Sequence, residues 1–463
     1  MSMEKIHFIY SKEADNTPII QIDPGKETNI VIDATGRKKL VIGLGMKRGE
    51  MTNRKLILLV RQIVAMAKSN RFKTIEVSVE ELVFKHLHIG DAELGELFAV
   101  NMEMANFEFV EFKTPPPEGW NFIEKIFIIG KANTAFKRGI EKGSLIGSEI
   151  NASRRLANMP AGDMTPTTLA QEAERTVEGL PVKVTLLGLK EIRELNMGAI
   201  LGVAKGSTEE PKFIVMEYRG GLKKDGPIVL VGKGVTFDSG GLNIKPSDHI
   251  YEMHMDMSGG AAVIHTIAAA ARLKLKKNVI VLVPAVENKP SGSSYHPGDV
   301  LKTMSGPTIE VLNTDAEGRV ILADALGYAK KFNPRLVVSV ATLTGAAEVA
   351  LGKRASAIFS KNERLVSKIQ TLGEESGDYV WPLPMWSEYE EEIKGTFGDW
   401  ANVGKTRVGG AIQGAVFLQQ FAKDYPFVHI DMAPRMVSVD GEYLAKGSAG
   451  APIRLLIKLI ESF

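Results

Sequence analysis

The chain has 463 residues, more than one hydrophobic core usually organises, so at least two domains are expected. Hydrophobic residues make up 44% and charged residues 24%, as in an ordinary globular protein. The 57 basic and 55 acidic residues leave a formal net charge of +2, which gives no electrostatic support for binding nucleic acid or an anionic membrane. The chain has no cysteine, which excludes disulfides, thiolate metal ligands and a cysteine nucleophile.

The sequence gives no signal for export or for a membrane span. Residues 1–10 lack a basic segment followed by an apolar stretch, as a secretory signal would have. No uninterrupted apolar run is long enough to cross a bilayer. We therefore expect a cytoplasmic protein with no membrane partner.

The first part of the chain alternates strand-like and helix-like stretches. Residues 40–44, 74–79 and 125–129 are typical of strands, and residues 51–69 carry apolar side chains at helical spacing. This pattern predicts a small N-terminal α/β domain over residues 1–141. It carries no residues that indicate a specific chemistry.

A linker helix is expected next, within a domain boundary at residues 142–165. Residues 142–158 have a helical pattern that ends before Pro160. Thr165 is then typical of an N-cap residue, and Pro166 suits the first turn of the helix that follows.

The remainder, residues 166–463, contains strongly apolar runs separated mostly by helical segments. Such runs are too apolar for burial on one side only, so they predict a central, mostly parallel sheet flanked by helices on both faces. Functional groups in such folds collect where the strands end. The predicted strands are residues 182–187, 213–216, 228–231, 279–283, 336–340 and 427–430.

Residues 313–319 (Asn-Thr-Asp-Ala-Glu-Gly-Arg) follow a short apolar run at 308–312 that is typical of a strand. If the backbone stays extended, Asp315, Glu317 and Arg319 point to one side. Two carboxylates and a guanidinium on one side are costly unless something charged lies between them. A divalent metal facing an anionic ligand would suit them, but spacing alone leaves a turn with a surface ion pair equally open.

Three familiar enzyme motifs are absent. Residues 226–234 have the wrong spacing for a phosphate-binding loop, with Gly234 at the position of the magnesium-binding hydroxyl. Ser239 does not lie in a Gly-x-Ser-x-Gly elbow. His249 and His254 do not form His-Glu-x-x-His, which excludes a single-zinc protease of that kind.

Four motifs in order resemble the leucine aminopeptidase (cytosol aminopeptidase) family. The resemblance is strong over residues 213–352 and looser to residue 463, whereas the first 140 positions match only in general layout. The motifs are residues 231–241 (Val-Gly-Lys-Gly-Val-Thr-Phe-Asp-Ser-Gly-Gly) followed by Lys245, residues 256–262 (Asp-Met-Ser-Gly-Gly-Ala-Ala), residues 313–319, and residues 341–346 (Ala-Thr-Leu-Thr-Gly-Ala).

The resemblance implies a site for two divalent metal ions. Asp238 and Glu317 would be shared, Asp315 would complete one ion, and Lys233 and Asp256 would complete the other. A site of oxygens with one amine and no imidazole suits Mn²⁺ or Zn²⁺, with Mg²⁺ or Co²⁺ possible.

The implied activity is that of an aminopeptidase, in which a water between the two metals is the nucleophile. Lys245 would polarise the scissile carbonyl, and Arg319 would hold a bicarbonate that serves as the proton shuttle. N-terminal Leu, Met and similar apolar residues are the expected preference, and the implied assembly is a homohexamer, a dimer of trimers. The substrate-binding residues implied by the resemblance are Lys245, Met253, Asn313, Thr342, Leu343 and Gly345.

Two departures from the family pattern leave the specificity open. Val320 replaces the usual Leu, and residues 405–413 differ from the commoner glycine-rich, hydroxyl-bearing loop. A narrow dipeptidase, for example one acting on Cys-Gly, and a non-catalytic scaffold remain alternatives, although a scaffold need not keep the whole set of charged residues. Nucleic-acid binding by an oligomer has no support from the near-neutral charge.

Overall fold

The computed structural model describes residues 5–11, 17–25, 27–406 and 408–463, and the chain forms two compact units. Unit 1 comprises Met1–Asn151 and Ser438–Lys446, and unit 2 comprises Ala152–Val437 and Gly447–Phe463. The division falls within the long helix α4 (Thr134–Asn158). Among the described residues, no helix is both long and apolar enough to cross a membrane.

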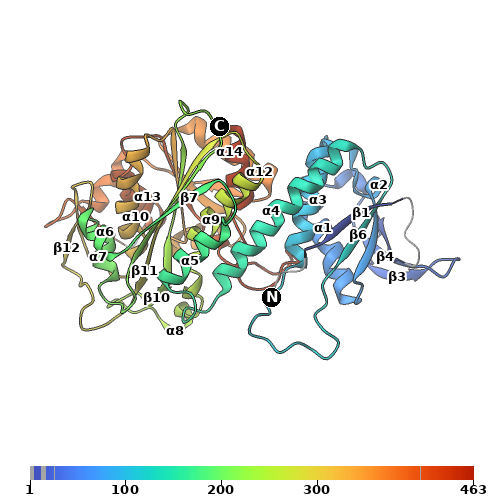
Figure 1. Cartoon of the computed structure of the whole chain (residues 1–463), viewed down its shortest axis with the longest axis horizontal. Coiled ribbons are helices and arrows are strands. Elements are labelled where there is room, and N and C mark those ends of the chain that lie inside the picture. Colours follow the sequence, from blue (N-terminus) through green and yellow to red (C-terminus); the bar gives the residue numbers. More distant parts are fainter. Residues whose placement is uncertain (1–4, 12–16, 26, 407) are drawn as a thin grey trace. The chain divides into compact units, whose positions relative to one another are not determined.

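Unit 1 is built on a six-stranded sheet in the order β1-β6-β5-β2-β4-β3 (Figure 1). All neighbouring pairs described in this sheet are parallel except β3 with β4. The helices α1 (Asn53–Ser69) and α3 (Asp91–Asn106) pack against each other and share one apolar core with the sheet. The strands are β1 (His7–Tyr10), β2 (Ile19–Asp23), β3 (Asn29–Ile32), β4 (Lys38–Gly43), β5 (Thr74–Ser78) and β6 (Lys125–Ile129).

Unit 2 contains a nine-stranded sheet in the order β16-β15-β18-β14-β9-β11-β8-β7, with β10 paired to β11. Five of its pairs are parallel and three are antiparallel, which confirms the predicted mostly parallel α/β class. Its strands are β7 (Val182–Leu187), β8 (Lys212–Arg219), β9 (Ile228–Gly232), β10 (Gly234–Asp238), β11 (Asn278–Asn288), β14 (Leu336–Ala341), β15 (Ser356–Phe359), β16 (Val380–Pro382) and β18 (Phe427–Asp431).

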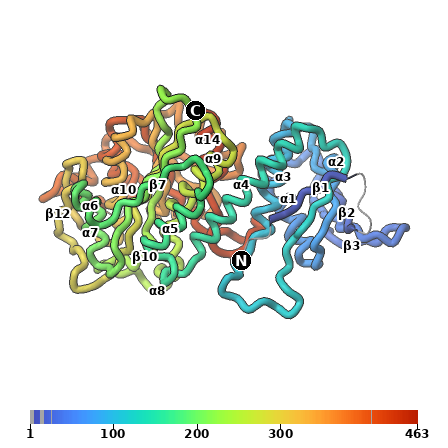
Figure 2. The backbone as a smooth tube through the Cα atoms, in the orientation of Figure 1, coloured from blue at the N-terminus to red at the C-terminus, as the bar shows by residue number. Residues whose placement is uncertain are grey.

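Helices cover both faces of this sheet, because its strands bury apolar side chains on both sides (Figure 1). One apolar core includes α7 (Gly198–Ala204), α10 (Glu317–Ala329) and α13 (Gly410–Gln420). The opposite core includes α5, α9, α12 and α14, and Figure 2 traces α14 beside α9 although they are far apart in sequence. Their bounds are α5 (Pro166–Thr176), α9 (Ser258–Arg272), α12 (Glu363–Ser376) and α14 (Ile453–Ser462).

The shorter elements complete unit 2. A small sheet joins β12 (Val300–Lys302), β13 (Thr308–Glu310) and β17 (Trp400–Ala401). Thr165 caps α5 as expected, since its side chain accepts the Thr168 N–H. Among the other short helices are α6 (Leu189–Glu194), α8 (Ser247–Ile250), η3 (Met253–Met255) and α11 (Gly345–Leu351).

The parallel strands β9, β10, β11 and β14 place their carboxyl ends at one edge of the sheet. Lys233 follows β9, Asp238 ends β10, and Thr342 follows β14. This edge therefore gathers residues from segments that are distant in sequence, as is usual for ligand sites in open α/β sheets.

One of the two interpretations of residues 313–319 depends on an extended backbone, and this condition is not met. Residues 315–319 are not extended, because α10 begins at Glu317, after the N-cap residue Ala316. Glu317 and Arg319 therefore lie in the first turn of a buried helix rather than alternating along a strand.

Candidate metal centre

Three carboxylates converge at the carboxyl edge of the unit 2 sheet. Asp238, Asp315 and Glu317 each offer one oxygen, and these oxygens lie within 4.8 Å of one another. Asp238 is 2% exposed and Glu317 is 1% exposed, so neither charge is solvated by bulk water. Asp256, two residues before the start of α9, is a fourth buried carboxylate at this site.

Two lysine ammonium groups lie among these carboxylates. Lys233 Nζ lies 2.7 Å from Asp256 Oδ2 and 2.8 Å from Glu317 Oε1, and it donates to the Thr342 carbonyl at 3.0 Å. Lys245 Nζ lies 2.8 Å from Asp238 Oδ2 and 2.5 Å from Asp315 Oδ1. The structure thus brings together the five proposed metal ligands and Lys245.

Charge and burial act in opposite directions on these lysines. Burial lowers the pKa of Lys233, but the carboxylates of Asp256, Glu317 and Asp238 outweigh it and leave the pKa above its ordinary value. The pKa of Lys245 is likewise raised, because Asp238 and its neighbours outweigh burial. Lysine donation to a metal would require loss of this proton, so binding of a cation at Lys233 would release it.

Burial is the main cause of the pKa shifts of the carboxylates. Burial raises the pKa of Asp238, and the neighbouring Glu317 charge raises it further, while Lys245 and Lys233 oppose the shift. The pKa of Asp256 is raised well above its ordinary value by burial. Burial also raises the pKa of Asp315. A buried cluster of carboxylates lowers the stability of the fold unless further positive charge compensates it.

The donor set fits divalent cations. Three buried oxygens, Asp256 Oδ2, Asp315 Oδ1 and Glu317 Oε1, accept no directed hydrogen bond among the described residues, although each touches a lysine ammonium. A cation can bind buried, charged oxygens of this kind without breaking an existing directed hydrogen bond. Carboxylate oxygens with one amine suit Mn²⁺, Mg²⁺, Co²⁺ or Zn²⁺.

Arg319 lies beside this cluster on α10. Its Nη1 donates to the Asn402 carbonyl at 2.8 Å, and its buried Nε has no hydrogen-bond partner among the described residues. Burial lowers the pKa of Arg319 to about 10, so the guanidinium remains charged at neutral pH. An unpartnered buried N–H on a cation is suited to binding an anion.

The substrate residues predicted from the resemblance divide between two places. Thr342 Oγ1 donates to Asp256 Oδ1 at 2.7 Å, so Thr342 directly adjoins the carboxylate cluster. Gly345 faces open space, since a Cβ built there would meet no atom within 4 Å. Leu343 packs against the core of unit 2, and its N–H donates to Asp431.

Met253 and Asn313 lie in the flanking segments. Met253 begins η3, which packs against β10 and ends directly before Asp256. Asn313 is held by Asn402, whose Nδ2 donates to the Asn313 carbonyl at 2.6 Å. The Asn313 side chain accepts the Asp315 N–H at 2.9 Å, so it shapes the loop that carries Asp315.

Sequence reasoning missed the polar residues that support these ligands. Asn288 ends β11 and donates from Nδ2 to Asp238 Oδ1 at 2.8 Å. Asn402 and Asn243 fix the segment that precedes α10. The available signal was a polar pair, Glu287 and Asn288, at the end of a long apolar run.

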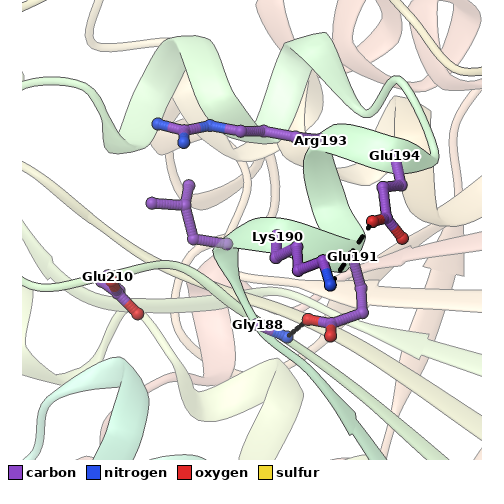
Figure 3. A pocket seen from close by; sticks show the side chains of 7 residues that line it. Gly188, Lys190, Glu191, Arg193, Glu194 and Glu210 are labelled. Atoms are coloured by element: carbon purple, nitrogen blue, oxygen red, sulfur yellow. Dashed lines mark hydrogen bonds and ion pairs between the residues drawn. The ribbon is translucent and has the colours of Figure 1, made fainter.

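A separate surface hollow lies at α6 and is lined by residues 188–191, 193, 194 and 210 (Figure 3). Two polar contacts lie within the hollow. Lys190 Nζ lies 3.9 Å from Glu194 Oε1, and the Gly188 N–H donates to Glu191 at 2.9 Å. The hollow shares no residue with the metal centre.

Fold and site together define a metal-binding α/β enzyme. Residues 151–457 match the model of the cytosol aminopeptidase family, catalytic domain. The chain therefore belongs to the cytosol aminopeptidase family, as its motifs indicate, and is a metal-dependent aminopeptidase and hydrolase.

Curated relatives agree with this assignment. A "Probable cytosol aminopeptidase" of Roseiflexus castenholzii is 38% identical over 436 residues, covering 92% of this chain and 87% of the relative. A protein of the same name from Burkholderia mallei is 42% identical over 356 residues, covering 76% of this chain and 70% of the relative.

Solved structures show the same fold. The bottromycin maturation enzyme BotP has a TM-score of 0.86 at 28% identity, covering 96% of this chain and 98% of BotP. The structure of BotP in complex with Mn has a TM-score of 0.87 at 27% identity, covering 99% of each chain.

Proposed function

We propose that this protein releases N-terminal amino acids, with Leu, Met and similar apolar residues preferred, from peptides with a free N-terminus. The observation that carries the proposal is the buried cluster of four carboxylates and two lysines at the sheet edge. Two divalent ions bound there would supply an activated water and would polarise the scissile carbonyl. Side chains of this protein are proposed to stabilise the oxyanion, to hold the proton shuttle and to bind the substrate.

The proposed ligand assignment is the one that the family resemblance implies. Asp238 and Glu317 would be shared between the two ions. Asp238 Oδ2 lies 2.8 Å from Lys245 Nζ, Glu317 Oε1 lies 2.8 Å from Lys233 Nζ, and both carboxylates lie close to Asp315. Asp315 would complete one ion, and Lys233 with Asp256 would complete the other. Mn²⁺ or Zn²⁺ is the proposed metal, and the Mn complex of the structurally similar BotP supports Mn²⁺.

Lys245 is proposed to stabilise the negative charge that develops on the carbonyl oxygen. Its ammonium lies beside Asp238 and Asp315, and its raised pKa keeps it protonated at neutral pH. A fixed, charged donor in a buried site stabilises an oxyanion more strongly than water does. Arg319 is proposed to hold a bicarbonate ion as proton shuttle, which its unpartnered Nε supports.

The free amine of the substrate has a pKa of roughly 8, so its neutral form is available as a metal ligand at neutral pH. This requirement would restrict cleavage to the first residue. The side chain of that residue is proposed to enter a pocket lined by Met253, Thr342 and Gly345, with Asn313 and Leu343 beside it. The open space at Gly345 supports room for an apolar side chain.

A cytoplasmic location is also proposed, which the names of the curated relatives support. The homohexamer, a dimer of trimers, is a proposal that rests on the family alone. Light scattering on the purified protein would test it, and a monomeric mass would overturn it.

The deciding experiment is hydrolysis of leucine p-nitroanilide by metal-stripped protein to which Mn²⁺ or Zn²⁺ is returned, with the N-acetylated substrate as control. We expect metal-dependent release from the free-amine substrate only. Folded, assembled protein that releases nothing with either metal would overturn the broad activity. A panel of dipeptides, including Cys-Gly, would then test a narrow specificity, which the similarity to the bottromycin maturation enzyme BotP favours as the alternative.

A further inference from the structure

Asn288 lies beside Asp238 at the carboxyl edge of the unit 2 sheet. It is the last residue of β11 and lies in register with Asp238, the last residue of the parallel strand β10. Its carbonyl accepts hydrogen bonds from Ser239 N at 3.0 Å and from Ser239 Oγ at 2.7 Å. The residue is 1% exposed, so its side chain must find its partners within the protein.

The two N–H groups of the Asn288 side chain reach two acceptors. Nδ2 donates to Asp238 Oδ1 at 2.8 Å and to the Thr314 carbonyl at 2.9 Å. Both partners are acceptors only, so the amide nitrogen must face them and the orientation of the amide is fixed. One side chain thus joins the end of β10 to the residue that precedes Asp315.

This contact leaves the two oxygens of Asp238 unequal. Oδ1 accepts from Asn288 and also from the Gly240 N–H at 2.9 Å. Oδ2 instead faces the centre, 2.8 Å from Lys245 Nζ. Because Oδ1 already has two donors, Oδ2 is the oxygen that remains for a cation.

We propose that Asn288 is a positioning residue with two roles. By donating to Oδ1 of Asp238 it leaves Oδ2 facing the metal centre, and by donating to the Thr314 carbonyl it holds the Asp315 loop in place. The inference rests on the proposed assignment of Asp238 and Asp315 as ligands. It adds that Oδ2 is the oxygen that Asp238 would offer to a cation, since Oδ1 accepts from Asn288 and Gly240. A partner that orients a ligand in this way contributes to metal affinity without touching the metal.

The position of the Asn288 side chain also destabilises the fold, which supports a role in the site. Asn288 Oδ1 is buried and accepts no hydrogen bond among the residues that the structure describes. It also lies where a Cβ on Gly241 would approach to 2.8 Å, so the turn after β10 needs glycine there. A buried acceptor without a partner destabilises a fold, and such costs are typical of residues kept for a site.

Asn288→Asp tests the proposal, because it keeps the shape of the side chain but replaces the donor by an acceptor that repels Asp238 Oδ1. The chain offers a matched control at the other end of β11. Asn278 is 3% exposed, and its Nδ2 also donates to two carbonyls, those of Leu222 and Asp225, both at 2.8 Å. Asn278→Asp therefore makes the same chemical change in the same strand with no ligand nearby.

The measurements are the Kd of Mn²⁺ for metal-stripped protein by calorimetry and the visible spectrum of the Co²⁺-loaded protein. We expect Asn288→Asp to weaken Mn²⁺ binding by roughly 10- to 100-fold and to change the Co²⁺ spectrum. Asn278→Asp should retain the wild-type Kd and spectrum. Asn288→Ala, which adds no charge, should also weaken binding, and it decides the matter if the Asp variant fails to fold.

Two results would overturn the inference and can be told apart with Asp238→Ala. If Asp238→Ala loses Mn²⁺ while both Asn288 variants keep the wild-type Kd and spectrum, the ligand assignment stands and the positioning role fails. If Asp238→Ala itself binds Mn²⁺ like the wild type, the ligand assignment of the proposed function fails, and the positioning role fails with it.

Discussion

Thr314 and Asn243 hold each other through reciprocal hydrogen bonds. The Thr314 N–H donates to Asn243 Oδ1 at 2.8 Å, and the Asn243 N–H donates to Thr314 Oγ1 at 2.9 Å. Thr314 Oγ1 also donates to the Gly240 carbonyl at 2.7 Å. The pair fixes the turn after β10, which leads to Lys245, against the loop that carries Asp315. These contacts explain how groups far apart in sequence reach one small volume.

Thr314→Val should weaken both the fold and the metal centre. The substitution keeps the volume of the side chain but leaves the Asn243 N–H and the Gly240 carbonyl without their partner, a loss of about 1–3 kcal/mol in the free energy of unfolding. Urea unfolding and Mn²⁺ titration of the same preparations would measure the two effects.

Thr266→Val is the matched control, because Thr266 is equally buried but bonds only the Ala262 carbonyl within α9. It should leave Mn²⁺ binding unchanged. Wild-type Mn²⁺ affinity in Thr314→Val would show that the reciprocal pair does not organise the centre.

Glu317→Ala should abolish metal binding and collapse turnover, because it removes a ligand proposed to be shared by both ions. Bound metal also stabilises the wild type, by about 2.7 kcal/mol when the free ion is at 100 times its Kd. The melting temperature should therefore rise with Mn²⁺ for the wild type and not for the variant. Glu363→Ala, at an exposed position in α12, should behave as wild type. Normal metal content and activity in Glu317→Ala would refute the ligand assignment.

Arg319→Ala should lower kcat by roughly 10²- to 10³-fold while leaving the metal content intact, because Arg319 is assigned no ligand role. Arg319→Lys keeps the charge but loses the planar set of donors, so an intermediate rate is expected. Elemental analysis beside steady-state kinetics would separate the two roles. Loss of the metals from Arg319→Ala would contradict this division.

The sequence predicted best what local chemistry determines. Thr165 and Pro166 mark the start of α5, because a cap and a first-turn proline act within one turn of helix. The predicted strand at 279–283 is shorter than β11 (Asn278–Asn288), which is buried throughout. Pro284 and the polar Glu287 and Asn288 are not typical of a buried strand, so the prediction ended too early.

The supporting shell of the site could not be read from the sequence, because its contacts are non-local. Asn288 and Thr314 are 26 residues apart, and Asn402 reaches Leu312 across 90 residues. A lone asparagine has no spacing signal that distinguishes such a role from a turn. The candidate ligands were visible only because their motifs occur together and in order.

The buried Glu103 of α3 should make stability depend on pH. Glu103 is 3% exposed and accepts a hydrogen bond from Ser144 Oγ at 3.0 Å. Burial raises the pKa of Glu103 to about 7, so the folded protein holds this proton more tightly than the unfolded chain does. The free energy of unfolding should therefore fall as pH rises from about 4.5 to about 7, by up to about 3 kcal/mol from this group alone.

Glu103→Gln should remove this fall, because an amide does not titrate and its oxygen can still accept from Ser144. The variant should match the wild type near pH 4 and exceed it in stability at pH 8. Urea unfolding of both proteins in the presence of a chelator, across pH 4 to 8, measures the difference without a contribution from bound metal. Parallel curves for wild type and Glu103→Gln would show that the pKa of Glu103 is the same in the folded and the unfolded protein, which would contradict the prediction.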